Sequence, residues 1–301
     1  MIPANRVLGP ETLLRGKAEE TPLNNERKVT VRKTPAAFIA ATAILTGALA
    51  TPAMAQDVEP NLVGGTPATG ETGWAASMHI KGRGFLCTGI LLFRDTVVIP
   101  SHCAFKKIGG MEPWDAKQVT VHVGSKDRTA GEVLKVAQVI PHESFTWGEG
   151  GKEFYDAAAL KLTKSANQQP LTLGGESAQP GDKVTMYGWG SDLPSGDTSN
   201  LPRKLQQLKT TIVDPAECAD ANIGVYEVCT DNPHGTDGPG GGDSGGPVVK
   251  VVDGVPTLVG IISRARDGAR PGEDETVATD APAFREWFYG KARGVTAAPP
   301  A

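Results

Sequence analysis

The sequence predicts an all-β protein. Short apolar segments recur through the middle of the chain, and 37 Gly and 23 Pro supply turns between them. Many short strands at intervals of roughly 8–12 residues are typical of a β-sandwich or a β-barrel. A helical period is clear only near the end, where Phe284, Trp287 and Phe288 share one face of a short helix. We therefore expect an all-β domain with a short C-terminal helix.

Length and composition are those of an ordinary globular domain. The chain has 301 residues, 39% of them apolar, and a formal charge of −4. This is enough apolar sequence for a sizeable core and too little basic charge to suggest nucleic-acid binding. The four cysteines are an even number in a chain with a targeting segment, so we expect two disulfides formed in an oxidising compartment.

A secretory signal is predicted near the N-terminus. Four basic residues precede an apolar run over 36–50, and Ala53-Met54-Ala55 then provides a small-x-small cleavage site. A membrane anchor is the alternative, but a run of about 15 residues is shorter than the roughly 20 that span a bilayer. We expect 27–55 to be the signal peptide and 56–61 a short propeptide. Residues 1–26 are polar, and we expect a wrongly assigned or unstructured extension there.

The predicted strands begin after Trp74. Ala76, Met78 and Ile80 alternate with polar residues, which indicates a strand with one buried face. Continuous apolar runs at 90–92 and 97–99 follow, bounded by turn residues. Similar segments lie at 119–123, 133–139, 157–162, 184–187, 205–212, 248–252 and 257–263.

One glycine-rich stretch carries chemistry. Gly241-Gly242-Asp243-Ser244-Gly245-Gly246-Pro247 places a serine between glycines. A serine hydroxyl is a poor nucleophile unless a base removes its proton and hydrogen-bond donors stabilise the oxyanion that forms. Glycines allow a tight turn that exposes the serine and directs neighbouring N–H groups toward the reacting carbonyl. Most glycine-rich stretches are only turns, so the assignment needs matching His and Asp segments.

The stretch Gly-Asp-Ser-Gly-Gly-Pro resembles the nucleophile loop of the chymotrypsin/trypsin-like serine proteases, and we expect a secreted, bacterial-type member. His102 stands before Cys103, as in the family, although the two preceding residues depart from the usual Ala-Ala. Asp156 opens a segment, Asp-Ala-Ala-Ala-Leu-Lys-Leu, that is similar to the family's Asp-Ile-Ala-Leu-Leu-Lys-Leu. The resemblance covers most of the chain after residue 61.

The resemblance implies a catalytic triad. Ser244 would be the nucleophile, His102 its general base and then general acid, and Asp156 the group that orients the imidazole. The glycines around Ser244 also satisfy the nucleophile-elbow pattern of the α/β-hydrolases, but that fold needs alternating helices and places Ser before Asp before His. Here the serine comes last, which argues against a lipase or esterase.

The same resemblance implies the architecture and the supporting residues. We expect two six-stranded antiparallel β-barrels, one over about 62–170 and one over about 171–290, with a tail rich in Ala and Pro at 291–301. The N–H groups of Gly242 and Ser244 would form the oxyanion hole. Ser263 would support the triad Asp and begin the edge that pairs with substrate.

An activation segment is implied at Leu62-Val63-Gly64-Gly65, which resembles the Ile-Val-Gly-Gly start of mature family members. There, a newly released amino group folds inward and pairs with the Asp before the nucleophile, here Asp243. Losing the partner of a buried charge costs about 3–5 kcal/mol, so this pair decides whether the oxyanion loop forms. Asn61 precedes the segment where Arg or Lys is usual, which argues against activation by a trypsin-like enzyme.

The family also implies how the cysteines pair. Cys87 is placed like the partner of Cys103, and Cys218 and Cys229 resemble a second bridge in the other barrel. A bridge between Cys87 and Cys103 would be worth on the order of 3 kcal/mol in the chain-entropy model. A third family bridge is absent, because Gly240 and Gly268 stand where relatives carry cysteines. We expect a more mobile pocket wall as a result.

The sequence does not decide which side chain the specificity pocket accepts. Gly238 stands at the pocket floor, where members that cut after Lys or Arg carry Asp. Two acidic sites lie nearby, Asp237 and the Glu-Asp-Glu run at 273–275, so both a neutral pocket and an acidic one reached from the side remain possible. Arg264 and Ala265 replace the usual Trp-Gly on the substrate edge, and Arg264 is expected to favour acidic residues just upstream of the cut.

We therefore expect a secreted, extracellular serine endopeptidase that acts through an acyl-enzyme. No metal or organic cofactor is implied, since the carboxylates around Lys126–Glu132 do not form a convincing calcium set. The expected partners are protein or peptide substrates and protein protease inhibitors, with no nucleic acid, no membrane after signal cleavage, and a monomeric state. The alternative is a non-catalytic homologue that binds a partner, but such homologues usually lack a triad residue, and here all are present.

Overall fold

A computed structural model describes residues 62–148, 153–193 and 195–292. The chain divides into two compact units, Met1–Ala55 and Gln56–Ala301, and all described residues belong to the second. The predicted signal peptide, propeptide and N-terminal extension lie outside the described residues, as does the tail beyond residue 292. No helix in the described ranges is long and apolar enough to cross a membrane.

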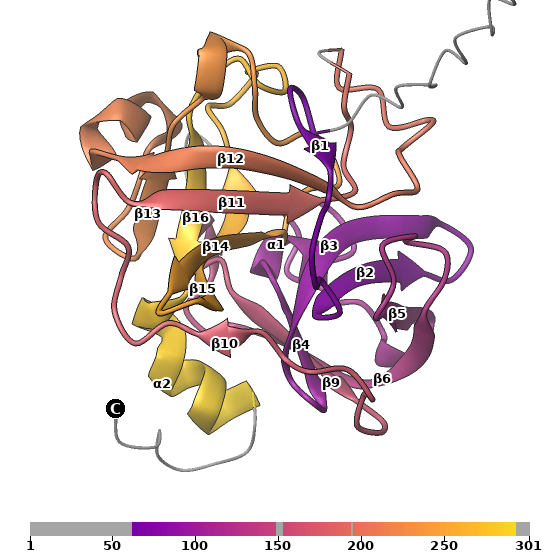
Figure 1. Cartoon of the computed structure of the whole chain (residues 1–301). Helices are drawn as coiled ribbons and strands as arrows, with labels where there is room; N and C mark the ends of the chain where they lie inside the picture. Colours follow the sequence, from indigo (N-terminus) through magenta and orange to yellow (C-terminus); the bar gives the residue numbers. More distant parts are fainter. Residues whose placement is uncertain (1–61, 149–152, 194, 293–301) are drawn as a thin grey trace, which may run out of the picture. The chain divides into compact units, whose positions relative to one another are not determined.

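The first half of the described chain forms a closed antiparallel barrel (Figure 1). Its strands pair in the order β2-β3-β4-β9-β6-β5, and β5 pairs back with β2. The strands are β2 (Ala75–Ile80), β3 (Gly84–Phe93), β4 (Thr96–Ile99), β5 (Val119–Val123), β6 (Glu132–Pro141) and β9 (Ala158–Leu162). Met78, Ile90, Val121, Leu134 and Leu160 are fully buried in this half of the core. The alternation predicted for 76–80 is only partly reflected, because Ser77 is buried too.

The second half closes in the same way. Six strands pair in the order β12-β11-β14-β15-β16-β13, and β13 returns to β12. They are β11 (Lys183–Gly188), β12 (Gln206–Val213), β13 (Glu227–Thr230), β14 (Pro247–Val252), β15 (Val255–Arg264) and β16 (Thr276–Asp280). The predicted pair of six-stranded antiparallel barrels is therefore confirmed. Short strands add to its edges: β1 (Thr66–Pro67) pairs with β12, and β10 (Thr172–Leu173) pairs in parallel with β15.

Helical structure is scarce among the described residues, as predicted. α1 (Ser101–Ala104) follows β4, and α2 (Arg285–Trp287) lies within a helical segment running from Pro282 to Ala292. Phe284 and Phe288 are buried against the core, while Trp287 is half-buried and its Nε1 donates to Glu143 Oε2 at 2.8 Å. Short 3₁₀ turns lie at Ala116–Gln118, Pro215–Ala221 and Pro233–Gly235, and β7 (Thr146–Trp147) pairs with β8 (Glu153–Phe154).

Both expected disulfides are present. Cys87 on β3 bonds to Cys103 on α1, and Cys218 bonds to Cys229 on β13. The first bridge fixes the short helix that carries His102 to the wall of the first barrel. The described residues contain no free cysteine.

Burial of Ile90 on β3 gives a test of the first barrel. Replacing fully buried Ile90 with Ala leaves a cavity in a closed barrel, so we expect the free energy of unfolding to fall by about 2–5 kcal/mol. Chemical denaturation with tryptophan fluorescence measures the change. Ile108→Ala is the matched control, since Ile108 is 90% exposed and its loss should change stability by about 0.5 kcal/mol or less. Equal effects of the two substitutions would contradict the burial described here.

Candidate active site

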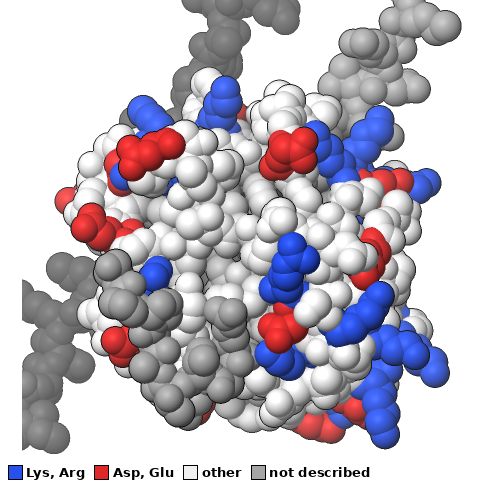
Figure 2. All heavy atoms as spheres, turned by 60° about the horizontal axis from the view of Figure 1, so that its bottom comes forward, with Lys and Arg blue, Asp and Glu red and all other residues white. Residues whose placement is uncertain are grey.

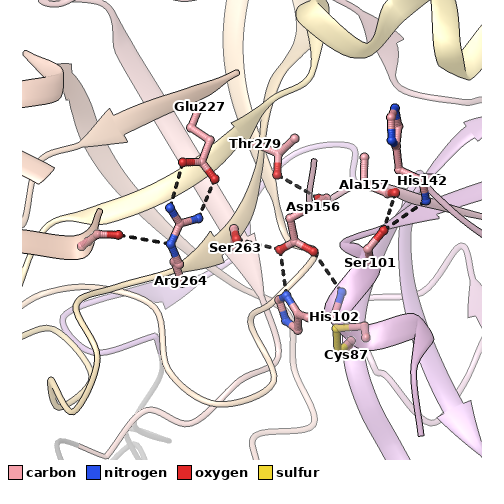
Figure 3. A network of polar contacts seen from close by, with 12 residues as sticks. Cys87, Ser101, His102, His142, Asp156, Ala157, Glu227, Ser263, Arg264 and Thr279 are labelled. Atoms are coloured by element: carbon pink, nitrogen blue, oxygen red, sulfur yellow. Dashed lines mark hydrogen bonds and ion pairs between the residues drawn. A yellow bond between two sulfur atoms is a disulfide. The ribbon is translucent and has the colours of Figure 1, made fainter. Parts of the chain in front are cut away.

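His102 and Asp156 meet where α1 and the start of β9 come together (Figure 3). The backbone N–H of His102 donates to Asp156 Oδ1 at 2.9 Å, and His102 Nδ1 lies 2.8 Å from Asp156 Oδ2. An ionised carboxylate can only accept, so Nδ1 carries the hydrogen and Nε2 is left as the basic nitrogen. The imidazole is 17% exposed while the Asp156 side chain is fully buried. The imidazole is therefore partly exposed, and the buried carboxylate fixes its orientation.

Asp156 is held from both barrels. Ser263 Oγ on β15 donates to Asp156 Oδ2 at 2.7 Å, and Thr279 Oγ1 on β16 donates to the backbone oxygen of Asp156 at 2.9 Å. Burial alone would raise the pKa of Asp156, but the charge of His102 and the hydrogen bonds from His102 and Ser263 outweigh it, so the pKa is lowered. Asp156 is thus an ionised carboxylate, which is the state that can stabilise an imidazolium.

Ser101 has a role that sequence reasoning missed. It is fully buried, its Oγ donates to the backbone oxygen of Ala157 at 2.6 Å, and the backbone N–H of His142 donates to it at 3.2 Å (Figure 3). The residue before His102 is thereby tied to the residue after Asp156. In the sequence it stood out only as a departure from the family's Ala.

Ser244 lies in a turn in which only some of the backbone N–H groups donate hydrogen bonds within the protein. The N–H groups of Asp243, Gly245 and Gly246 donate to Gly240 O, Ile262 O and Asp243 O, at 3.0, 2.8 and 2.7 Å. Within the described ranges, the N–H groups of Gly242 and Ser244 donate to no other protein atom. They are the two groups predicted to bind an oxyanion, and they are available for that purpose.

The backbone at Gly242 requires glycine. Its φ is +101°, in the region that other residues rarely adopt, and a Cβ would lie 3.0 Å from the Phe85 ring. Ser191 N–H donates to Gly241 O at 2.8 Å. Because C=O and N–H point in opposite directions in a trans peptide, this bond turns the Gly242 N–H away from Ser191.

Asp243 is a fully buried carboxylate. Gly190 N–H donates to its Oδ1 at 2.7 Å, and Gly240 N–H donates to its Oδ2 at 2.8 Å. Burial raises the pKa of Asp243 to about 7, since these two hydrogen bonds do not replace the lost hydration and Asp192 adds a like charge. No cation among the described residues forms an ion pair with it.

Leu62 is fully buried in the core of the second barrel, among side chains that include Val184 and Met186. Val63 O accepts from Gly238 N–H at 3.0 Å. The first two residues of the predicted activation segment, Leu62 and Val63, are therefore buried, while Gly64 is exposed.

A cavity of about 320 Å³ adjoins Ser244 and Ser263. None of its lining residues is acidic. The cavity is lined by Gly196, Pro239, Gly240, Gly241, Ser244, Ile262, Ser263, Arg264, Ala265, Ala269, Arg270, Pro271 and Thr276. Sequence reasoning missed Thr276, since which residues face the cavity depends on how two distant loops meet.

Gly238, the expected floor residue, is not among the residues that line this cavity, so its place at the pocket floor stays a prediction. The loop carrying Gly272 covers it, because a Cβ at Gly238 would lie 3.1 Å from Gly272 Cα. Asn232 Nδ2 holds that loop by donating to Gly272 O at 2.9 Å. Thr276 Oγ1 is 4.0 Å from the same Cβ position and does face the cavity.

Three of the four nearby acids have partners of their own. Asp237 Oδ2 lies 2.8 Å from His234 Nδ1, and its carboxylate packs on Gly64. Asp274 pairs with Arg266 at 2.6 Å, and Glu273 Oε2 accepts from the N–H of Arg270 at 2.8 Å. These contacts argue against the acidic pocket that the sequence left open.

Arg264 lines the cavity, but its guanidinium is engaged by an acidic residue of the second barrel. Its guanidinium makes a two-pronged ion pair with Glu227 at 2.5 and 2.8 Å and donates to Asn222 O and Ala221 O (Figure 3). The side chain is only 9% exposed. The preference for acidic residues upstream of the cut stays a prediction, and the pairing of this guanidinium with Glu227 argues against it.

The acidic residues of the first-barrel loop do not fit a calcium site. Asp127 pairs with Arg203 at 2.6 Å, and Glu132 pairs with Lys164 at 2.9 Å. Calcium needs several free oxygen ligands, and these carboxylates are each occupied by a cationic side chain.

Residues 62–288 match the family model described as Trypsin. Human kallikrein-8 is 29% identical over 227 residues, covering 71% of this chain and 80% of the relative. Trypsin-1 of Astacus astacus is 28% identical over 228 residues, covering 70% and 92%.

The fold has close counterparts among solved structures. Mouse neuropsin, a serine protease expressed in the limbic system, superposes with a TM-score of 0.63 at 25% identity, covering 75% of this chain and 98% of neuropsin. These relatives are animal proteins, which does not support the expectation of a bacterial-type member. The family model spans most of the chain, and the chain belongs to the trypsin family of serine proteases.

Proposed function

We propose that this protein is a secreted serine endopeptidase that acts through an acyl-enzyme. The observation that carries the proposal is the His102–Asp156 pair, which leaves a basic imidazole nitrogen directed outward from a buried carboxylate. Within the part of the chain that the structure describes, the N–H groups of Gly242 and of Ser244 itself have no acceptor in the protein. Family membership supports a protein substrate, and the two disulfides support an extracellular location.

The proposed reaction has two halves. His102 Nε2 takes the proton of Ser244 Oγ while that oxygen attacks the peptide carbonyl, and the N–H groups of Gly242 and Ser244 bind the resulting oxyanion. The imidazolium then gives its proton to the leaving amine, the peptide C–N bond breaks, and an ester to Ser244 remains. Water attacks that ester with His102 again as base, which releases the acid and restores the serine.

The lining of the cavity argues against basic side chains before the cut and offers apolar surface for uncharged ones. Pro239, Ile262, Ala265 and Ala269 offer apolar surface, and Thr276 adds a neutral hydroxyl. A lysine or arginine placed there would be desolvated without a carboxylate to pair with, which is costly.

Activation is proposed to follow release of a new amino group at Leu62. Among the described residues, no cation pairs with the buried Asp243 carboxylate, and a new amino group that reached it would form an ion pair with it. Protein substrates, protein inhibitors and a monomeric state complete the proposal. On the face shown in Figure 2, basic and acidic side chains are interspersed, which does not favour a nucleic-acid partner.

The alternative of a non-catalytic binding homologue is tested by the serine. We expect the protein starting at Leu62 to cut a mixed peptide library and to react with a fluorophosphonate, and Ser244→Ala to lose both. Ser165→Ala, at an exposed serine, should behave like the wild type. Mass spectrometry of the digests provides the measurement. Folded wild-type protein with no Ser244-dependent cutting would favour the binding homologue.

The same library tests the pocket. We expect cuts to follow uncharged side chains, because the residues lining the cavity include no acid. Asp237→Asn should leave the profile unchanged, since Asp237 faces His234 and Gly64. Cuts clustered after Lys or Arg that disappear in Asp237→Asn would show that the acid reaches the pocket after all.

Asp243 predicts a pH dependence of stability in a chain that still extends upstream of Leu62. The folded-state pKa of about 7 lies above the ordinary value of 3.8, so the folded chain holds the proton more tightly between these values. The contribution of Asp243 to stability is therefore present below pH 4 and is lost as pH rises toward 7. We expect the Tm difference between wild type and Asp243→Asn to shift against the wild type from pH 5 to pH 8. An unchanged difference in thermal scans would contradict this burial effect.

A further inference from the structure

The two peptide planes that meet at the Gly242 Cα need contacts from outside the turn to hold them in place. Gly242 has no side chain, and glycine rotates freely, so the direction of its N–H is set by what holds the neighbouring carbonyls. Ser191 N–H holds Gly241 O on one side. On the other side, Gly242 O accepts two hydrogen bonds from Thr88 of β3, one from its N–H and one from its Oγ1, each at 3.0 Å.

Thr88 is built into this position. It is fully buried, and its hydroxyl also accepts from Trp189 N–H at 3.3 Å, so the oxygen both donates and accepts. Its carbonyl lies against Gly245, where a Cβ would be 2.1 Å from Thr88 O. One residue of the first barrel therefore contacts the second-barrel turn on both sides of Ser244.

We propose that Thr88, through its hydroxyl, is a positioning residue for the oxyanion hole. It touches neither substrate nor the reacting atoms; it acts by fixing the carbonyl of Gly242, and through it the direction of the Gly242 N–H. The hydroxyl also joins Gly242 to Trp189, which begins the loop whose Ser191 holds the other carbonyl. The hydrogen bond between Trp189 and Thr88 therefore links the two contacts that hold the Gly241 and Gly242 carbonyls. This inference depends on the proposed protease function.

Thr88→Val is the direct test, because valine keeps the shape and removes the hydroxyl. We expect kcat on the best library peptide to fall by about tenfold to a hundredfold, as small misplacements of catalytic groups do, with KM changed by less than about threefold. The rate of fluorophosphonate labelling should fall in parallel, because the phosphoryl oxygen occupies the same site. Thr88→Ser restores the hydroxyl and should return kcat to within about threefold of wild type.

A matched control separates positioning from general stability. Thr210 on β12 is also buried, and its Oγ1 donates to Asp231 O at 2.7 Å, an acceptor outside the nucleophile turn. Thr210→Val removes a comparable hydrogen bond, so its Tm should fall while kcat stays within about twofold. A similar loss of kcat in both variants would overturn the proposal.

The outcomes are distinguishable from a failure of the protease assignment. Wild type without Ser244-dependent cutting would reject the proposed function. An active wild type with Thr88→Val at normal kcat, or Thr88→Ser without recovery, would reject only the role of Thr88. If Thr88→Val does not fold, Thr88→Ala is measured against the same limits; failure of both to fold would show that the hydroxyl serves folding and would overturn the proposal.

Discussion

The buried carboxylate of Asp156 is the interaction on which the rest of the molecule depends. It stands at the start of a first-barrel strand, accepts two hydrogen bonds from His102 of the same barrel, and accepts a third from Ser263 of the other barrel. A buried charge is tolerated only when it is paired and hydrogen-bonded, so the two barrels must dock in one register to satisfy it. The same hydrogen bonds to Asp156 therefore hold the two barrels together and orient the imidazole of His102.

In the nucleophile turn, some backbone N–H groups hold the turn together and others have no acceptor among the described residues. Three of its N–H groups are used within the protein, to fix the turn, and those of Gly242 and Ser244 are left over. The turn contributes no cationic side chain for this purpose, so the capacity to bind an oxyanion comes from backbone direction alone. Contacts from outside the turn must then supply the rigidity that its glycines lack.

Sequence reasoning succeeded where chemistry is carried by a contiguous motif. The strands, the closing helix and the cysteine pairs followed from periodicity and resemblance, and His102 and Asp156 are indeed adjacent. It failed where a residue's partner lies far along the chain. Glu227 neutralises Arg264 from 37 positions away, and Gly272 covers Gly238 through the fold of a separate loop. The sequence offered no signal for the role of Thr88, because a threonine inside an apolar strand is usually only a packing residue.

The close packing around Gly240 limits how a disulfide could be engineered into this protein. The missing family disulfide would need a cysteine there, but a Cβ at Gly240 would lie 2.3 Å from Ser191 O. Making room means moving Ser191, whose own N–H holds the carbonyl of Gly241. A covalent cross-link between 240 and 268 therefore competes with the backbone arrangement beside the nucleophile. Two cysteine substitutions would not graft the relatives' bridge onto this chain; the loop beginning at Ser191 would have to be redesigned with them.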